Sequence, residues 1–302
     1  MSGNSNGLQA KIRSLYPSAV FIHCFSHKLN LVLSQSCSKI RECKIFFSAL
    51  SGMVRFFNHS SKRMFTFDKI VNRRMPSSSQ TRWDFNGRIV LMLANHLEDL
   101  KTLFRTIIHE NAEKWDSETI NMSIGYLHLI EEDGLFLSQL YFFSDIFPEV
   151  DILFKNLQTK SNDISSALNN LKTFDLLLED KKNNFEKFWE EINKIEDIEQ
   201  KLKNSRSRNE ASENPKSFLE NLIIKIINII KEELEFRFGN LQGIDFIQLL
   251  NISKFSQYAT SFPSNLLQSL EKIYYDFFEI ASLKTELSAV YRNKEFQEKK
   301  YY

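Results

Sequence analysis

Apolar residues recur at helical spacing over most of the chain, and this pattern predicts a mainly α protein. Beyond residue 117 they return every three, four or seven positions, with charged residues on the opposite face. This is the spacing of amphipathic helices that cover a core. We therefore expect helices over 117–131, 133–158, 161–203, 217–238 and 264–288.

Local signals divide this helical part of the chain. Asn183-Asn184 can break the 161–203 segment into two helices, and the polar, aperiodic stretch 204–215 predicts a linker. Ser217 and Glu220 have the spacing of a capping box, in which each side chain accepts from a free backbone N–H of the other residue. A helix is expected to begin there.

The first 90 residues show one short apolar run ahead of the first long helix. Helices are expected over 27–36, 38–58 and 86–111, while the run from Ala19 to Ile22 predicts a buried strand. A lone strand leaves backbone groups unpaired, at roughly 1–3 kcal/mol for each one buried without a partner. Either the run is not a strand, or the rest of its sheet lies outside these residues.

Composition agrees with a helical, soluble, intracellular protein. Gly (8) and Pro (5) are scarce among 302 residues, which favours helices joined by short loops. No apolar run approaches the roughly 20 residues of a membrane span, and the polar start of the chain shows no secretory signal. No membrane partner is expected. The cysteines are an odd number, which argues against a disulfide framework; they are Cys24, Cys37 and Cys43.

Charge is divided unevenly between the two ends of the chain. Residues 1–90 hold 14 Lys and Arg against 3 Asp and Glu, whereas the remainder holds 25 against 35. A basic end on a nearly neutral chain is expected where one part faces a polyanion. The basic N-terminal third therefore favours DNA as a partner, and a merely basic surface is the alternative.

Cys24 and His27 stand at a spacing compatible with two zinc ligands. Zinc takes four protein ligands, or three and a water, and the neighbouring residues do not complete a finger. From spacing alone we expect a junction in which Cys24 packs while His27 and Asn30 hydrogen-bond to nearby backbone. No metal site is expected.

Arg82 and Trp83 follow a serine-rich loop, where an indole can stack on a base while a guanidinium holds phosphate. The alternative is a tryptophan that anchors the next helix to the core. Arg73, Arg74 and Arg88 are further candidates for phosphate contact, and a solvated basic surface is again the alternative. The complete basic string is Lys62, Arg63, Lys69, Arg73, Arg74, Arg82 and Arg88.

Motifs of known hydrolytic and phosphate-transfer chemistry are missing from the sequence. It has no glycine-rich phosphate loop, nucleophile elbow or His-Glu-x-x-His segment. Residues 1–67 contain no aspartate, and their one glutamate is Glu42. Two-metal phosphoryl transfer needs several converging carboxylates, which this basic region cannot supply. We therefore expect no enzymatic activity, no catalytic residues and no cofactor.

Three blocks resemble consecutive motifs of the hAT transposase superfamily. They are SGNSNGLQA at 2–10, HCFSHKLNL at 23–31 and QTRW at 80–83. The resemblance is nearest to the branch with zinc-finger MYM-type proteins and THAP-domain repressors of the inhibitor of the protein kinase. LEFRF at 234–238 is similar to an element that closes a helix in that branch.

The resemblance implies an incomplete RNase H-like α/β region over 1–90, a helical insertion over 91–250 and a return segment over 251–302. The family's catalytic acids would stand before the first block, near the second block and beyond Tyr302, so Mg²⁺ is expected only in a complete active relative. Cys24 and His27 correspond to the family's Cys-x-x-His pair, and Trp83 corresponds to a tryptophan that stacks at the cleaved DNA end.

A truncated or domesticated, nuclear hAT-like fragment without nuclease activity is therefore expected, with weak DNA binding. The alternative is a helical module that binds a protein partner through the 161–238 helices.

Overall fold

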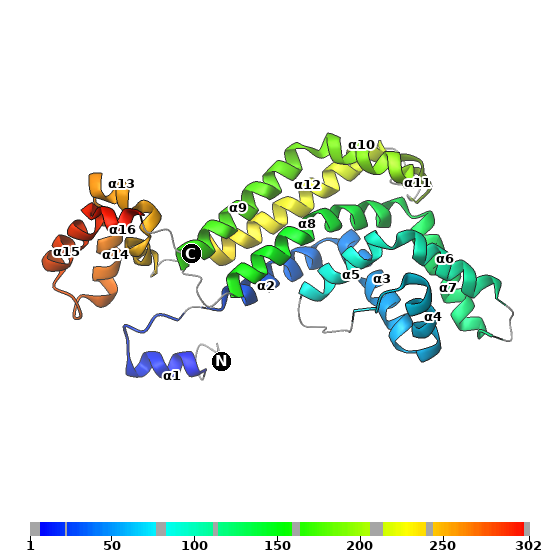
Figure 1. Cartoon of the computed structure of the whole chain (residues 1–302), viewed down its shortest axis with the longest axis horizontal. Coiled ribbons are helices and arrows are strands. Elements are labelled where there is room, and N and C mark those ends of the chain that lie inside the picture. Colours follow the sequence, from blue (N-terminus) through cyan, green and yellow to red (C-terminus); the bar gives the residue numbers. More distant parts are fainter. Residues whose placement is uncertain are drawn as a thin grey trace. The chain divides into compact units, whose positions relative to one another are not determined.

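Helices make up all the regular secondary structure of the part of the chain described by the computed structural model. That part comprises residues 7–21, 23–76, 83–110, 114–158, 164–205, 214–239 and 244–298. No β strand occurs in these ranges (Figure 1). The prediction of a mainly α protein is confirmed.

The strand expected over the run from Ala19 to Ile22 does not form where the structure describes it. Residues 19–21 and 23 lie in irregular backbone, and Ile22 falls outside the described residues. Val20 and Phe21 are 37% and 40% exposed, so water can satisfy the backbone that a buried strand would have to pair. No second strand stands in the described ranges to receive it, and the RNase H-like portion expected over 1–90 is therefore not seen there.

The helices group into two compact units. One combines residues 28–159 and 170–234, and the other combines 1–27, 160–169 and 235–302. In chain order the helices are α1 (Leu8–Leu15), α2 (Phe25–Lys39), α3 (Arg41–Asn58), α4 (Ser61–Val71), α5 (Trp83–Asn95), α6 (Leu97–His109), α7 (Ser117–Glu131), α8 (Gly134–Gln158), α9 (Ile164–Asn183), α10 (Phe185–Glu196), α11 (Ile198–Ser205), α12 (Pro215–Leu234), η1 (Glu235–Gly239), η2 (Asp245–Leu250), η3 (Ile252–Lys254), α13 (Phe255–Thr260), α14 (Ser264–Tyr274), α15 (Ile280–Arg292) and α16 (Lys294–Glu298).

The long helix α8 organises the larger unit. It packs against α3, α5, α7 and α11 (Figure 1), and thirteen of its 25 residues are buried. Its aromatic side chains meet those of α3, because Phe143 stacks on Phe46 at 5.5 Å between ring centroids and on Phe147 at 5.4 Å. Rings of this kind bury large apolar areas, so this layer is the centre of the unit's core.

Predicted and observed helices agree best where the apolar spacing is regular. The helix predicted over 117–131 is confirmed as α7, which Asp116 caps by accepting the Thr119 N–H at 2.7 Å. The 161–203 segment is interrupted twice, at Asn184 and at Asp197. Asp197 adopts a left-handed backbone conformation with φ 48°, which an α-helix cannot continue.

The prediction that a capping box at Ser217 begins a helix is wrong. The helix α12 begins earlier, at Pro215, and the Asn214 side chain accepts from the Lys216 N–H at 2.8 Å. Proline fits the first helical position because its missing N–H has no partner there in any case. The linker expected at 204–215 falls mostly outside the described residues, and the boundary expected at residue 90 falls within α5.

Helices η2 to α16 enclose a small core of their own within the smaller unit. Tyr291 is its fully buried centre and contacts the rings of Phe255, Tyr258 and Phe262. The Tyr291 hydroxyl donates to the Leu249 carbonyl at 2.8 Å. Among all the helices that the structure describes, none combines the length and apolarity that crossing a membrane requires.

Candidate nucleic-acid interface

Helix α4, which the apolar spacing did not predict, carries the most distinctive surface of the larger unit. Phe67 and Val71 are buried on its inner side, and the helix packs on α3 and α6. Ser60 caps its start by accepting the Arg63 N–H at 3.3 Å. Asn72 ends it in a left-handed conformation with φ 52°, which an asparagine tolerates better than most residues.

The outward side of α4 combines an aromatic ring with lysines. Phe65 is 70% exposed, and Lys62 and Lys69 flank it at positions i−3 and i+4, which neighbour it on a helix surface. Arg73 and Arg74 are exposed directly after the helix. Exposed Lys and Arg beside an aromatic face are typical of surfaces that bind nucleic acid.

The outward side of α3, the helix packed against α4, is basic as well. Arg41, Lys44 and Arg55 are exposed on it, with serines between them and no acidic residue among the exposed positions. The opposite side is buried through Phe46 and Leu50, among others. This amphipathic division fixes which side chains face solvent. We define the α3–α4 basic surface as Arg41, Lys44, Arg55, Lys62, Phe65, Lys69, Arg73 and Arg74.

Arg63 belongs to the basic string but points inward, which corrects its expected place among the phosphate-contact candidates. Its Nε donates to the Phe56 carbonyl at 2.7 Å and its Nη1 donates to the Thr119 hydroxyl at 2.8 Å. The guanidinium also lies 4.4 Å from the centroid of the Phe56 ring. Arg63 therefore joins α4 to α3 and to α7, and it holds the basic surface in place.

Trp115 supports the same helix from the connection between α6 and α7. Its side chain is 4% exposed, its Nε1 donates to Glu110 Oε2 at 2.9 Å, and Lys62 Nζ lies 4.4 Å from its ring centroid. Lys62 also donates to the Lys114 carbonyl. Sequence reasoning missed Trp115, although a tryptophan between a polar turn and a predicted helix start is a recognisable anchor.

The carboxylates near α4 are committed to their own neighbours. Hydrogen bonds from Lys114 and then Trp115 lower the pKa of Glu110. Hydrogen bonds from the backbone and side chain of Thr119 lower the pKa of Asp116. Both acids therefore hold hydrogen-bond partners in their own segment, and Lys62 of the basic surface also helps to lower the pKa of Glu110.

The predicted DNA-contact residues have mixed outcomes. Arg73 and Arg74 belong to the α3–α4 basic surface, and Arg88 is exposed on α5. Arg82 lies outside the described residues. Trp83 begins α5, but its side chain falls outside what the structure describes, so its expected stacking role stays a prediction.

The Cys-x-x-His pair lies at the start of α2. Cys24 precedes the helix and is exposed, His27 is exposed in its first turn, and Asn30 is half-buried one turn later. In the described ranges, no three His, Cys, Asp or Glu side chains lie together as metal ligands would.

The other two cysteines pack inside the larger unit. Cys37 and Cys43 are 4% and 0% exposed, and burial raises the pKa of the Cys37 thiol, which also hydrogen-bonds with Cys43. Deeply buried thiols with a raised pKa behave as small apolar groups.

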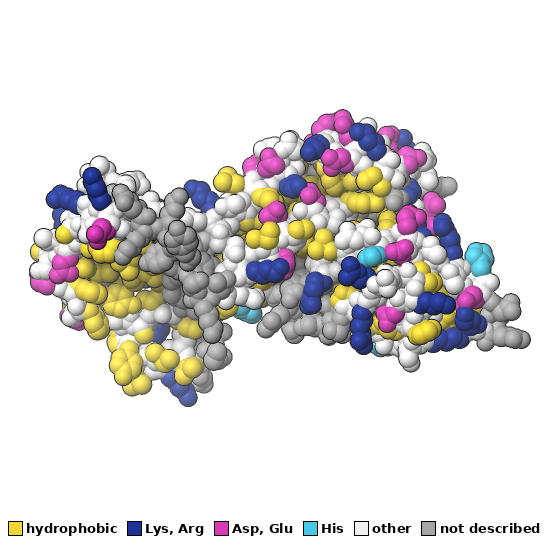
Figure 2. Space-filling model, in the orientation of Figure 1, with side chains coloured by type: hydrophobic (Ala, Val, Ile, Leu, Met, Phe, Trp, Pro, Cys, Tyr) yellow, Lys and Arg dark blue, Asp and Glu magenta, His cyan; other side chains and the backbone are white. Residues whose placement is uncertain are grey.

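Figure 2 shows Lys and Arg side chains over α4 and α7, with hydrophobic side chains and some Asp and Glu side chains among them. This arrangement could hold a phosphate backbone and stack one exposed base. No protein-family model matches the chain, and no solved structure matches it.

Proposed function

We propose that the protein is a nuclear, hAT transposase-derived helical protein that binds DNA and does not cleave it. The observation that carries the proposal is the α3–α4 basic surface, where seven Lys and Arg residues are exposed on two packed helices and the following segment. Lysine and arginine bind phosphate oxygens without reading the bases, so binding is expected to be tolerant of sequence.

Local charge supports this proposal. Within the described residues 28–76, ten Lys and Arg stand against two acids, Glu42 and Asp68. Cations released from DNA when a protein neutralises its phosphates provide much of the binding free energy. A surface with few acids of its own gains most from this effect, because few of its cations are already held by a carboxylate. Among these ten residues, Lys39 is paired with Glu233 at 2.6 Å.

Phe65 adds a second kind of contact. An aromatic ring exposed among cations can stack on an unpaired base, at about 1–3 kcal/mol for each base. Bases in a continuous duplex are already stacked on one another. We therefore expect Phe65 to favour single-stranded DNA, or DNA with unpaired bases, over an intact duplex.

The resemblance to hAT transposases supports the choice of DNA and the absence of cleavage. Its motif blocks carry no aspartate near the Cys-x-x-His pair, and two-metal cleavage needs several carboxylates on the metal ions. In this proposal the described helices correspond to the helical part of the family, and any RNase H-like portion would need strands from residues other than those described.

The rival proposal, a module that binds protein through the 161–238 helices, has less support. Leu176 and Ile195 are 61% and 63% exposed on α9 and α10, yet single exposed apolar side chains are ordinary on protein surfaces. Several lysines on these helices are paired with acids, as Lys231 is with Glu179 at 2.7 Å and with Asp175 at 3.5 Å.

Fluorescence anisotropy with labelled duplex and single-stranded DNA tests the proposal. The variant Lys44→Glu/Lys69→Glu/Arg73→Glu should weaken binding at least about tenfold in moderate salt, because three phosphate contacts become repulsive. The control Lys172→Glu/Lys194→Glu/Lys225→Glu reverses three exposed lysines of α9, α10 and α12. This control has the same net charge as the first variant, and its affinity for DNA should stay close to that of the wild type.

Equal weakening in both variants would mean that overall charge, and not this surface, attracts the DNA. A nuclease assay with Mg²⁺ or Mn²⁺ tests the second half of the proposal. We expect intact substrate, and cleavage that is lost on adding a chelator would contradict it.

A further inference from the structure

Helix α1 has an apolar stripe that nothing covers in the described structure. Leu8, Ile12 and Leu15 are 54%, 43% and 74% exposed, and they recur at the spacing of one helix face. None of the eight residues of α1 is buried. Isolated helices shorter than about 12–15 residues are marginal in water, so α1 needs an apolar surface to remain helical.

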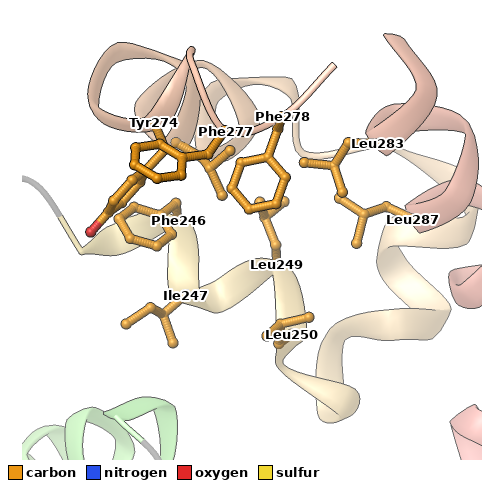
Figure 3. A pocket seen from close by; sticks show the side chains of 10 residues that line it. Phe246, Ile247, Leu249, Leu250, Tyr274, Phe277, Phe278, Leu283 and Leu287 are labelled. Atoms are coloured by element: carbon orange, nitrogen blue, oxygen red, sulfur yellow. The ribbon is translucent and has the colours of Figure 1, made fainter. Parts of the chain in front are cut away.

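Such a surface exists in the group of helices from η2 to α16. A cavity of about 500 Å³ opens there, with a lining made almost wholly of apolar side chains. Figure 3 shows the rings of Phe246, Tyr274 and Phe277 close together on one side, with Phe278 between them and Leu283 of α15. Phe277 is 67% and Phe278 is 43% exposed, so the rim is apolar as well as the floor.

Charge at the rim complements α1. The turn between α14 and α15 carries Asp276 and Glu279, both exposed, and no basic residue. Lys284 on the next helix lies 5.6 Å from the Phe262 ring centroid, and Phe262 packs against Tyr291 of the core that the cavity adjoins. Helix α1 carries Lys11 and Arg13 and no acid.

The cavity is within reach of α1 in the same chain. Phe25, where α2 begins, contacts Phe238 of η1 with ring centroids 5.7 Å apart. The nine residues from 16 to 24 can span roughly 30 Å, and the eight from 239 to 246 can span about 26 Å. Both segments begin at the contact between Phe25 and Phe238. A tether of this length gives α1 a high effective concentration at the cavity.

We propose that α1 docks in this cavity of its own chain. Leu8, Ile12 and Leu15 insert between the η2 side chains and the aromatic rim, while Lys11 and Arg13 face Asp276 and Glu279. This contact is independent of DNA binding, and it would bring the N-terminal segment that precedes the Cys-x-x-His pair onto the C-terminal helices.

Hydrogen exchange of the full chain, followed by mass spectrometry, tests the contact. The backbone amides of residues 11–16 donate within α1, as Lys11 does to Gly7 and Tyr16 does to Ile12. They should exchange at least tenfold more slowly than in an unstructured peptide of the same sequence. Ile12→Asp and Phe277→Asp should each abolish this protection, whereas Ile124→Asp, at a 49% exposed position of α7, should leave it intact.

Each alternative has its own outcome. Unprotected α1 amides in the wild type would overturn the proposal, as would protection that survives Phe277→Asp while α14 and α15 remain protected. Protection that disappears on hundredfold dilution would show that α1 docks on a second copy, and would overturn docking within one chain. Protection that is unchanged on dilution and lost in both variants supports it.

Discussion

Gly134 of α8 lies directly against the backbone of Leu202 in α11. A Cβ atom built on Gly134 would stand 2.7 Å from the carbonyl carbon of Lys201 and closer still to the amide nitrogen of Leu202. Only glycine allows the two helices to approach this closely. The contact fixes the start of the central helix against α11, where Leu202 is fully buried.

The first prediction follows from this contact. Gly134→Ala should destabilise the larger unit by about 1–3 kcal/mol, because the added methyl group meets backbone that cannot rotate away. Gly125 of α7 is the matched control, since a Cβ atom placed on it would meet nothing within 4 Å. Gly125→Ala should stabilise by up to about 1 kcal/mol through helix propensity. Urea unfolding followed by tryptophan fluorescence measures both, and equal effects would contradict the contact.

Tyr291 predicts a pH dependence of the smaller core. Burial raises its pKa to about 12, while an unfolded tyrosine has a pKa near 10. Because the pKa is higher in the folded chain, the contribution of Tyr291 to the free energy of unfolding is fully present below pH 10. It is lost as pH rises from about 10 to about 12, and the free energy of unfolding then falls by up to about 1.4 kcal/mol per pH unit. The Tyr291→Phe variant has no hydroxyl to titrate at this position, so it should not lose this contribution to stability.

Removing the Tyr291 hydroxyl also leaves the Leu249 carbonyl without its donor, at a cost of about 1 kcal/mol. The variant should therefore be less stable than the wild type at pH 8, and this deficit should shrink by pH 11. Thermal unfolding followed by circular dichroism compares the two chains at each pH. A deficit that stays constant would contradict a buried, protonated Tyr291.

The three cysteines should differ in reactivity. Cys24 is exposed, whereas Cys37 and Cys43 are buried and burial raises the pKa of Cys37. A thiol reagent near pH 8 should modify one cysteine quickly in the native protein and all three in denaturant, since the exposed thiolate reacts first. Cys24→Ser should remove the fast phase. Two fast thiols in the native wild type would contradict the burial of Cys37 and Cys43.

Phe65 should distinguish single-stranded from double-stranded DNA. Phe65→Ala is expected to weaken binding to single-stranded DNA by about 1–3 kcal/mol and to leave duplex affinity nearly unchanged. Because the side chain is 70% exposed, stability should change by less than about 0.5 kcal/mol. Ile152→Ala, at a 51% exposed apolar position of α8, is the control and should not affect either affinity.

Sequence spacing predicted the fold best where one helix face is continuously apolar. It located α7 to the residue, but it missed α4, whose few inward residues stand among six polar or charged ones. It also predicted a strand at 19–22, which is wrong for the residues described. A run of four apolar residues has the same sequence pattern whether it forms a paired strand or an irregular segment. Pairing depends on a second strand, which local spacing cannot reveal.

The sequence predicted that the candidate site is basic, but it did not predict which of its cations face solvent. The basic string indicated Arg73 and Arg74, which are exposed. Nothing in the string distinguishes Arg63, which turns inward because the Phe56 carbonyl and the Thr119 hydroxyl lie within reach. Those partners are brought together by the packing of α3, α4 and α7, so only the folded chain shows which cations remain available.

The salt dependence of duplex binding tests the central proposal most directly. For the wild type, the logarithm of the binding constant should fall linearly with the logarithm of the salt concentration, by about 0.9 for each phosphate neutralised. Lys44→Glu/Lys69→Glu/Arg73→Glu should reduce this slope by about 2.7, while Lys172→Glu/Lys194→Glu/Lys225→Glu should keep it. A wild-type affinity that does not change with salt, or an equal slope in both variants, would contradict DNA binding through the α3–α4 basic surface.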